Sequence, residues 1–367
     1  MSYKTPNILT IMGTRPQYVK CAVLRGAFKE AGIKEVLLDT GQHYDSNMST
    51  GIFQQLKVPE PDIKLALGGK SQCTTIGSMI IELERVVNEL NPRAVVVLGD
   101  TNSTLAGGLV AKRLGKPLLH IEAGLRSHDK TMPEEQNRIV IDHLSDQLFC
   151  PTQRAVANLQ SEGLEKGVHF TGDVMFDAVL KYRSMFVRPD SISESSLKSG
   201  FDLVTLHRAD ALSSKESLQT RINYIREHSL AYSKIFLVHP NTAKKLNEYE
   251  IEIDDFICIE PQGYLETQWL LSRADHLFTD SGGMQREAFF HGCKTTTLRN
   301  STEWEETFMD GNNRLWTAPS SDVDSSLKIS SKPYGDGDAG GKISELISKY
   351  FFNILPREFN SQVQRVS

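Results

Sequence analysis

The chain has 367 residues, 39% of them hydrophobic and 24% charged, and a formal net charge of -5. This composition is that of an ordinary soluble globular protein, and the length favours two domains over one. A negative net charge without a basic run argues against a nucleic-acid partner, so an anionic ligand would have to be bound by local arginines and lysines.

The first predicted strand, residues 7–12, leads through a glycine turn into a helix. A glycine turn ahead of a helix N-terminus can accept a phosphate, and Arg15 and Lys20 place two cations close by. The turn lacks GxGxxG spacing, so an ordinary strand-to-helix turn explains it about equally well. The next strand, residues 35–39, ends in a polar cluster in which His43 is either an acid-base group or, more commonly for a lone loop histidine, solvated surface.

Two further strands, residues 95–98 and 118–121, flank a helix in the middle of the first half. Both are continuous apolar runs, as expected of parallel strands that are covered on both faces. Asp100 follows the first strand, and Glu122 follows the second. Because open α/β sheets bind ligands beyond the carboxyl ends of their strands, both acids should reach the same edge, with Glu134 following on what we expect to be a loop.

Each of these acids also has a purely structural explanation. An Asp directly after a strand is commonly a helix N-cap. Glu122 should be partly buried, where a carboxylate needs a partner or a task, and Arg126 and Arg138 are available as partners. The acids therefore fit a buried ion-pair network as well as proton-transfer chemistry.

After a Ser-rich connection, residues 188–199, the alternation of strands and helices restarts. The strands of this second half, like those of the first, end in polar residues, among them His207, and Gln262 lies shortly after another strand end. We therefore predict an α/β protein with two Rossmann-like, doubly wound domains that face a cleft. The predicted domains are residues 1–170, with the C-terminal helix 351–367 as a candidate addition, and residues 171–350.

Ser281, Gly282 and Gly283 form the better phosphate candidate of the two halves. Two glycines at a helix N-terminus let an anion approach unpaired backbone N–H groups, and the Ser281 hydroxyl adds a donor. Glu287 lies about one turn into that helix, where its carboxylate could accept both hydroxyls of a ribose. The same carboxylate would also interact favourably with the helix dipole, so both readings remain open.

Five cysteines are scattered through the chain without CxxC spacing, which indicates neither a zinc site nor a disulfide framework. We expect no metal and no cofactor. The N-terminal residues lead directly into a strand without a signal-peptide pattern, and no apolar run approaches the length of a membrane span. We therefore expect a cytoplasmic protein without a membrane partner.

Taken in order, the motifs of the chain resemble those of one family, the non-hydrolysing UDP-N-acetylglucosamine 2-epimerases. The motifs cover essentially the whole chain: GTRPQ at Gly13, TGQHYD at Thr40, GDTNST at Gly99, HIEAGLRS at His120, MPEEQNR at Met132, VTLHR at Val204, VHPNT at Val238, QGYLE at Gln262, TDSGGMQREA at Thr279 and TEWEET at Thr302. The resemblance implies a glycosyltransferase-B-like fold and a cofactor-free epimerisation at C2, in which UDP is eliminated to leave 2-acetamidoglucal and is then added back.

The resemblance also implies roles for individual residues. It assigns catalysis to Asp100, Glu122, Glu134 and His207, the last of which also matches a nucleotide-binding position. It assigns substrate binding to Arg15, Lys20, Arg138, Gln262, Ser281, Gly282, Gly283 and Glu287. The expected ligand is a UDP-sugar, and we expect a homodimer that serves cell-surface polysaccharide biosynthesis.

Several alternatives stay open at this stage. The motif sequences GTRPQ, TGQHYD and SGGMQREAFF also favour the branch of the family that acts on UDP-2,3-diacetamido-2,3-dideoxyglucuronic acid. A hydrolysing 2-epimerase would release UDP and free N-acetylmannosamine, and a glycosyltransferase of the same fold would not require this set of acids. A catalytically inactive sugar-nucleotide sensor would keep the residues around Ser281 but lose the carboxylates, all of which are present.

Overall fold

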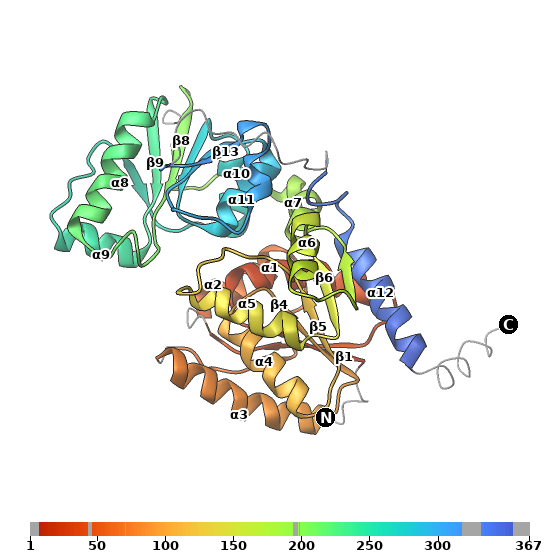
Figure 1. Ribbon diagram of the computed structural model, residues 1–367. Coiled ribbons are helices and arrows are strands. Elements are labelled where there is room, and N and C mark those ends of the chain that lie inside the picture. Colours follow the sequence, from red (N-terminus) through yellow and green to blue (C-terminus); the bar gives the residue numbers. More distant parts are fainter. Residues whose placement is uncertain are drawn as a thin grey trace. The chain divides into compact units, whose positions relative to one another are not determined.

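The structure, a computed structural model, describes residues 7–42, 46–69, 71–193, 197, 199–317 and 332–354. It divides into two compact units, residues 1–178 with 332–367, and residues 179–331 (Figure 1). The chain thus leaves the first unit at residue 178, where the sequence suggested 170, and returns at Lys332, earlier than residue 351.

The first unit is built on a parallel sheet of seven strands, in the order β3-β2-β1-β4-β5-β6-β7. The strands are β1 (Ile8–Met12), β2 (Glu35–Asp39), β3 (Ile63–Lys64), β4 (Ala94–Leu98), β5 (Leu118–Ile121), β6 (Gln147–Cys150) and β7 (Val168–Phe170). Every residue of β4 is buried, because the apolar run packs against helices on both faces of the sheet. The strand order reverses between β1 and β4, which pair directly, and this reversal is where doubly wound sheets bind ligands.

Eight helices accompany this sheet: α1 (Arg15–Glu30), α2 (Ser46–Gln55), α3 (Gln72–Leu90), α4 (Asn102–Arg113), α5 (Pro133–Leu144), α6 (Gln153–Ser161), α7 (Val174–Tyr182) and the C-terminal α12 (Ala339–Ile354). The last of these joins the first unit because Asp177 on α7 accepts hydrogen bonds from the N–H groups of Ala339 and Gly340 at its start. Gly340 then lies against Ala27 of α1. Only residues 351–354 of the predicted C-terminal helix 351–367 are described.

The second unit contains a parallel sheet of six strands, in the order β10-β9-β8-β11-β12-β13. Its elements are β8 (Phe201–Thr205), α8 (Lys215–His228), β9 (Ser233–Leu237), α9 (Pro240–Glu248), β10 (Ile257–Ile259), α10 (Tyr264–Leu271), β11 (His276–Thr279), α11 (Gly282–His291), β12 (Lys294–Thr297) and β13 (Asn313–Leu315). Here the order reverses between β8 and β11, which pair directly. The prediction of two Rossmann-like, doubly wound domains is therefore confirmed.

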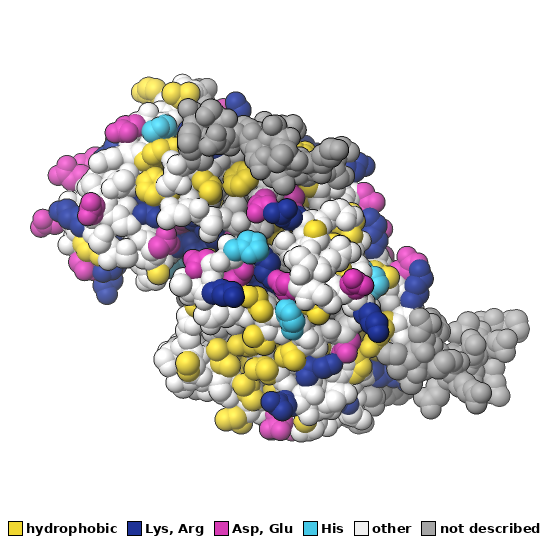
Figure 2. Space-filling view, in the orientation of Figure 1, with side chains coloured by type: hydrophobic (Ala, Val, Ile, Leu, Met, Phe, Trp, Pro, Cys, Tyr) yellow, Lys and Arg dark blue, Asp and Glu magenta, His cyan; other side chains and the backbone are white. Residues whose placement is uncertain are grey.

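One sequence expectation is wrong in detail. The loop expected to carry Glu134 is in part helix α5, which starts with Pro133 at its first position, where a missing N–H costs nothing. None of the described helices has the length and apolar character needed to span a membrane. On the face shown in Figure 2, basic and acidic side chains are interspersed over both units.

Candidate functional site

The turn after β4 presents the first predicted acid, Asp100. Gly99 takes a left-handed conformation with φ of 60°, and Thr101 caps α4 by accepting a hydrogen bond from the N–H of Thr104. Since Thr101 serves as the N-cap, the capping explanation for Asp100 does not hold. The Asp100 carboxylate instead accepts hydrogen bonds from the guanidinium of Arg138, at 2.7 and 2.9 Å.

Glu122, directly after β5, also has a left-handed backbone, with φ of 72°, which is uncommon for a residue with a side chain. Its carboxylate forms an ion pair with the ammonium group of Lys20 from α1, and both side chains are largely buried. Arg126, which the sequence offered as a partner, pairs instead with Asp142 and Glu162. A Cβ atom on Gly99 would lie 3.0 Å from this carboxylate, so the turn after β4 and the end of β5 are in contact.

Arg138 joins Asp100 to a second carboxylate, Glu135, at 2.6 Å. Glu135 is almost completely buried and accepts hydrogen bonds from the N–H groups of Ser127 and His128. Burial alone would raise the pKa of Glu135, but these N–H donors and the guanidinium lower it below its ordinary value. Glu134, the predicted catalytic residue, is the half-buried neighbour in the first turn of α5, where the helix dipole favours a carboxylate.

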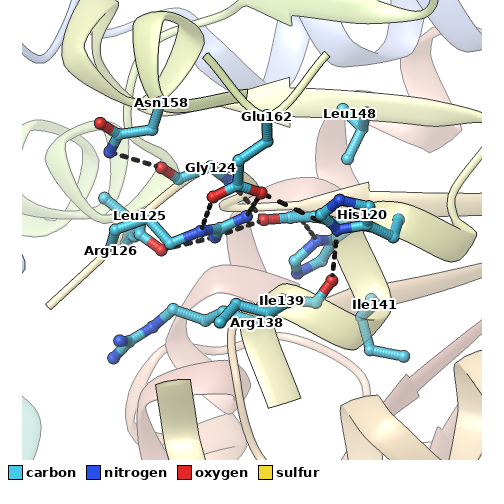
Figure 3. A network of polar contacts seen from close by, with 12 residues as sticks. His120, Gly124, Leu125, Arg126, Arg138, Ile139, Ile141, Leu148, Asn158 and Glu162 are labelled. Atoms are coloured by element: carbon cyan, nitrogen blue, oxygen red, sulfur yellow. Dashed lines mark hydrogen bonds and ion pairs between the residues drawn. The ribbon is translucent and has the colours of Figure 1, made fainter. Parts of the chain in front are cut away.

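A further polar network of the first unit includes Arg126, Glu162, Gly124 and Asn158 (Figure 3). His120 on β5 contacts the Asp142 carboxylate at 2.7 Å and the Gly99 carbonyl oxygen at 2.8 Å. Arg126 donates to Asp142 and, with two nitrogens, to Glu162, the C-cap of α6. The sequence reasoning missed His120 and Asp142 as members of the site; a histidine inside an otherwise apolar buried strand was the available signal.

The turn after β1 holds the remaining predicted residues of the first unit. The Gln17 side chain accepts hydrogen bonds from the N–H groups of Gly13 and Thr14 and donates to the Leu98 carbonyl at 2.7 Å, which ties this turn to the end of β4. Arg15, the first residue of α1, is half-buried. His43 lies outside the described residues.

In the second unit, the buried Asp280 connects the ends of β8 and β11. It accepts hydrogen bonds from the backbone N–H groups of His207 and Arg208, each at 2.9 Å, and its other oxygen lies 3.3 Å from the His207 ring. Burial would raise the pKa of Asp280, but these contacts with His207 and Arg208 lower it. Asp280 thus positions His207 at the strand-order reversal, a role that sequence reasoning did not assign to it.

Ser281 is the N-cap of α11, and its hydroxyl accepts a hydrogen bond from the N–H of Met284 at 3.4 Å. A Cβ atom on Gly282 would lie 2.2 Å from a carboxylate oxygen of Glu303, so a larger residue there would force a rearrangement. No atom lies within 4 Å of a Cβ atom built on Gly283. The helix N-terminus therefore has open space on one side and an acidic side chain on the other.

Further along α11, Glu287 accepts a hydrogen bond from the side-chain amide of the buried Gln268. The oxygen of that amide lies 2.8 Å from the ring of His291, whose pKa burial lowers to about 4. Gln268 is thereby oriented with its donors toward Glu287. Gln262, ahead of α10, donates to the carbonyl of Glu260 at 2.7 Å.

The structure places Arg15 and Asp100 at the strand-order reversal of the first unit, and His207 and Ser281 at the reversal of the second. The described contacts join Lys20 to Glu122 and Asp100 to Arg138. The first unit carries acids that form ion pairs with cations, and the second carries a glycine-rich helix N-terminus, each at the carboxyl edge of a doubly wound sheet. These features define a ligand-binding α/β enzyme of two Rossmann-like domains.

The chain belongs to the UDP-N-acetylglucosamine 2-epimerase family, whose sequence profile matches residues 27–348. It is 39% identical to UDP-2,3-diacetamido-2,3-dideoxy-D-glucuronate 2-epimerase of Pseudomonas aeruginosa, over 93% of this chain and 99% of that protein. It is 37% identical to UDP-N-acetylglucosamine 2-epimerase of Methanococcus maripaludis, over 92% and 97% respectively.

A solved structure of the same family is also similar. The crystal structure of Methanocaldococcus jannaschii UDP-GlcNAc 2-epimerase in complex with UDP-GlcNAc and UDP has a TM-score of 0.81 and 34% sequence identity, and the match covers 93% of this chain and 99% of that chain. The family predicted from the motifs is confirmed, and so is the prediction of an isomerase of the sugar-nucleotide 2-epimerase class.

Proposed function

We propose that this protein interconverts UDP-GlcNAc and UDP-ManNAc by eliminating UDP and adding it back. A base removes the C2 proton as the bond from C1 to the UDP oxygen breaks, which leaves 2-acetamidoglucal and UDP. The UDP oxygen then bonds to C1 again while an acid delivers a proton to the opposite face of C2. Atoms and charges balance without an oxidant, a reductant or a cofactor.

The observation that carries this proposal is that Asp100 and Glu122 follow the neighbouring strands β4 and β5, and that each is paired with its own cation. Removing the weakly acidic C2 proton requires a positioned base, and returning it to the other face requires an acid. We assign these proton transfers to Asp100, Glu122 and Glu134. The ion pairs with Lys20 and Arg138 suit carboxylates that start the reaction ionised.

We assign the nucleotide to the other set of residues. The N-terminus of α11 at Ser281, Gly282 and Gly283 suits the diphosphate, and Glu287 suits the ribose hydroxyls. His207, with Arg15 and Lys20, would stabilise the charge that develops on the leaving diphosphate. Arg138 and Gln262 are assigned to the substrate. This assignment is supported by the UDP and UDP-GlcNAc in the crystal structure of the similar Methanocaldococcus jannaschii enzyme.

A second substrate, UDP-2,3-diacetamido-2,3-dideoxyglucuronic acid, is favoured by the 39% identity to the Pseudomonas aeruginosa enzyme named for it. The two candidates differ at C3 and C5 of the sugar, where the second carries an acetamido group and a carboxylate. Both would be epimerised by the same proton transfers at C2. We further propose a cytoplasmic homodimer that serves cell-surface polysaccharide biosynthesis.

The test is to incubate the protein with each UDP-sugar alone and resolve the products by NMR. Epimerisation of either one supports the proposal, and the ratio of the two kcat/KM values identifies the substrate. Release of UDP with free N-acetylmannosamine would contradict the proposal and indicate a hydrolysing 2-epimerase. Binding of UDP without turnover of either sugar would indicate a sugar-nucleotide sensor.

A further inference from the structure

His120 lies between two hydrogen-bond acceptors in the interior of the first unit. Its side chain is completely buried. Its Nε2 atom is 2.8 Å from the carbonyl oxygen of Gly99, and its Nδ1 atom is 2.7 Å from a carboxylate oxygen of Asp142. A carbonyl oxygen can only accept, so Nε2 must carry a proton.

The other ring nitrogen also carries a proton, because Asp142 is ionised. The second oxygen of Asp142 already accepts from the N–H of Gly124 at 3.1 Å and from Arg126 at 2.7 Å. An ionised carboxylate 2.7 Å from Nδ1 requires a donor there.

The charges of the side chains around Asp142 also favour a protonated His120. Arg126 binds two carboxylates, those of Asp142 and of the partly exposed Glu162 (Figure 3). A neutral imidazole would leave Arg126, Asp142 and Glu162 with one negative charge in excess, although Glu162 is partly exposed and also lies 3.8 Å from the His143 ring. A protonated His120 balances it, and a buried carboxylate is tolerated when it is paired in this way.

We infer that His120 is a buried imidazolium that positions the three acids of the proposed reaction. It holds the carbonyl of Gly99, the residue before Asp100, and it stands two residues before Glu122 on β5. Through Asp142 it fixes α5, which carries Glu134 in its first turn and Arg138 between Glu134 and Asp142. This role rests on the proposed function, because it matters to catalysis only if these acids transfer the protons.

The charge state can be measured without any activity assay. In protein labelled with 15N-histidine, both ring nitrogens of His120 should give signals of protonated nitrogens at about pH 7.5. His169 on β7 is a matched internal control, since it contacts the Gln147 amide oxygen at 2.8 Å and burial lowers its pKa. It should show one protonated and one bare nitrogen. Assignment uses the variants His120→Gln and His169→Gln, and a bare nitrogen on His120 would overturn the inference.

The positioning role is tested by kinetics of the same two variants. His120→Gln should lower kcat by about tenfold or more, the usual effect of losing a group that orients reacting side chains, while the Kd for UDP stays within about twofold. His169→Gln should change neither. Far-UV circular dichroism shows whether the first unit of each variant is folded, so that a loss of folded protein is not read as slower turnover.

A kcat of folded His120→Gln within about twofold of the unaltered protein would remove the positioning role, even with the imidazolium confirmed. If the unaltered protein epimerises neither UDP-sugar, the proposed function fails, whereas the NMR result still decides the charge state of His120.

Discussion

Replacing Lys20 by Met should destabilise the first unit, because it leaves the Glu122 carboxylate buried without its cation. Met keeps most of the volume of the lysine stem and removes only the ammonium group. The two side chains are 5% and 10% exposed, so solvent screens the pair little. Removing one partner of a buried ion pair costs about 3 to 5 kcal/mol, and we expect about 3 here because Glu122 keeps some contact with water.

The assay can separate the two units, because all three tryptophans lie in the second: Trp269, Trp304 and Trp316. In urea unfolding, Lys20→Met should shift the part of the far-UV circular dichroism transition that belongs to the first unit and leave the tryptophan fluorescence transition unchanged. Lys112→Met is the matched control, since the Lys112–Asp146 pair is 33% and 35% exposed and its loss should cost less than about 1 kcal/mol.

The double variant Lys20→Met, Glu122→Gln removes both charges and should recover most of the stability, because neither charge is then left alone. It should not recover epimerisation. If Lys20→Met costs no more than Lys112→Met, the ion pair contributes little to the first unit, and Lys20 is left with its proposed nucleotide role alone.

Three further predictions concern binding, mechanism and pH. Glu287→Gln should weaken UDP binding by roughly tenfold or more in calorimetry and change stability by less than about 1 kcal/mol; unaltered UDP affinity would remove the ribose assignment. Product formed in D2O should carry deuterium at C2, and the amide variants of Asp100, Glu122 and Glu134 should each turn over roughly two to four powers of ten more slowly; protium retained at C2 would exclude the scheme. Burial raises the pKa of Glu35 to about 7, so the stabilisation from its protonated form is complete below about pH 4.5 and is lost as the pH rises through 7. Glu35→Gln should therefore reduce the fall in the free energy of unfolding between these pH values. An unchanged fall would show that another group causes it.

The positions of the candidate residues could be predicted from sequence because they depend on strand ends. Apolar runs such as residues 118–121 mark the buried strands, and β5 has these bounds in the structure. Glu122 and His207 follow such runs directly, and Asp100 follows one after Gly99, so each lies at the carboxyl edge of its own parallel sheet. Short strands such as β7, with three half-buried residues, have no apolar run to reveal them.

The hydrogen-bond partners of these residues were harder to predict, because they depend on packing. The sequence does not show that the Ser281 hydroxyl caps α11, or that Asp280 accepts a hydrogen bond from the N–H of His207. Glu134 was assigned to a loop because its neighbours Pro133 and Glu135 suit loops and helix starts alike.

The pairing of Lys20 with Glu122 shows why sequence distance misleads at such a site. Arg126 is four residues from Glu122, whereas Lys20 is 102 residues away. The chain turns at Gly124, whose φ of 82° only glycine adopts readily, and directs Arg126 to Asp142 behind the sheet. β1 and β5 are both neighbours of β4, and α1 starts just beyond β1, so its second turn reaches the end of β5. Strand order, and not spacing along the chain, therefore selects the cation that accompanies each acid.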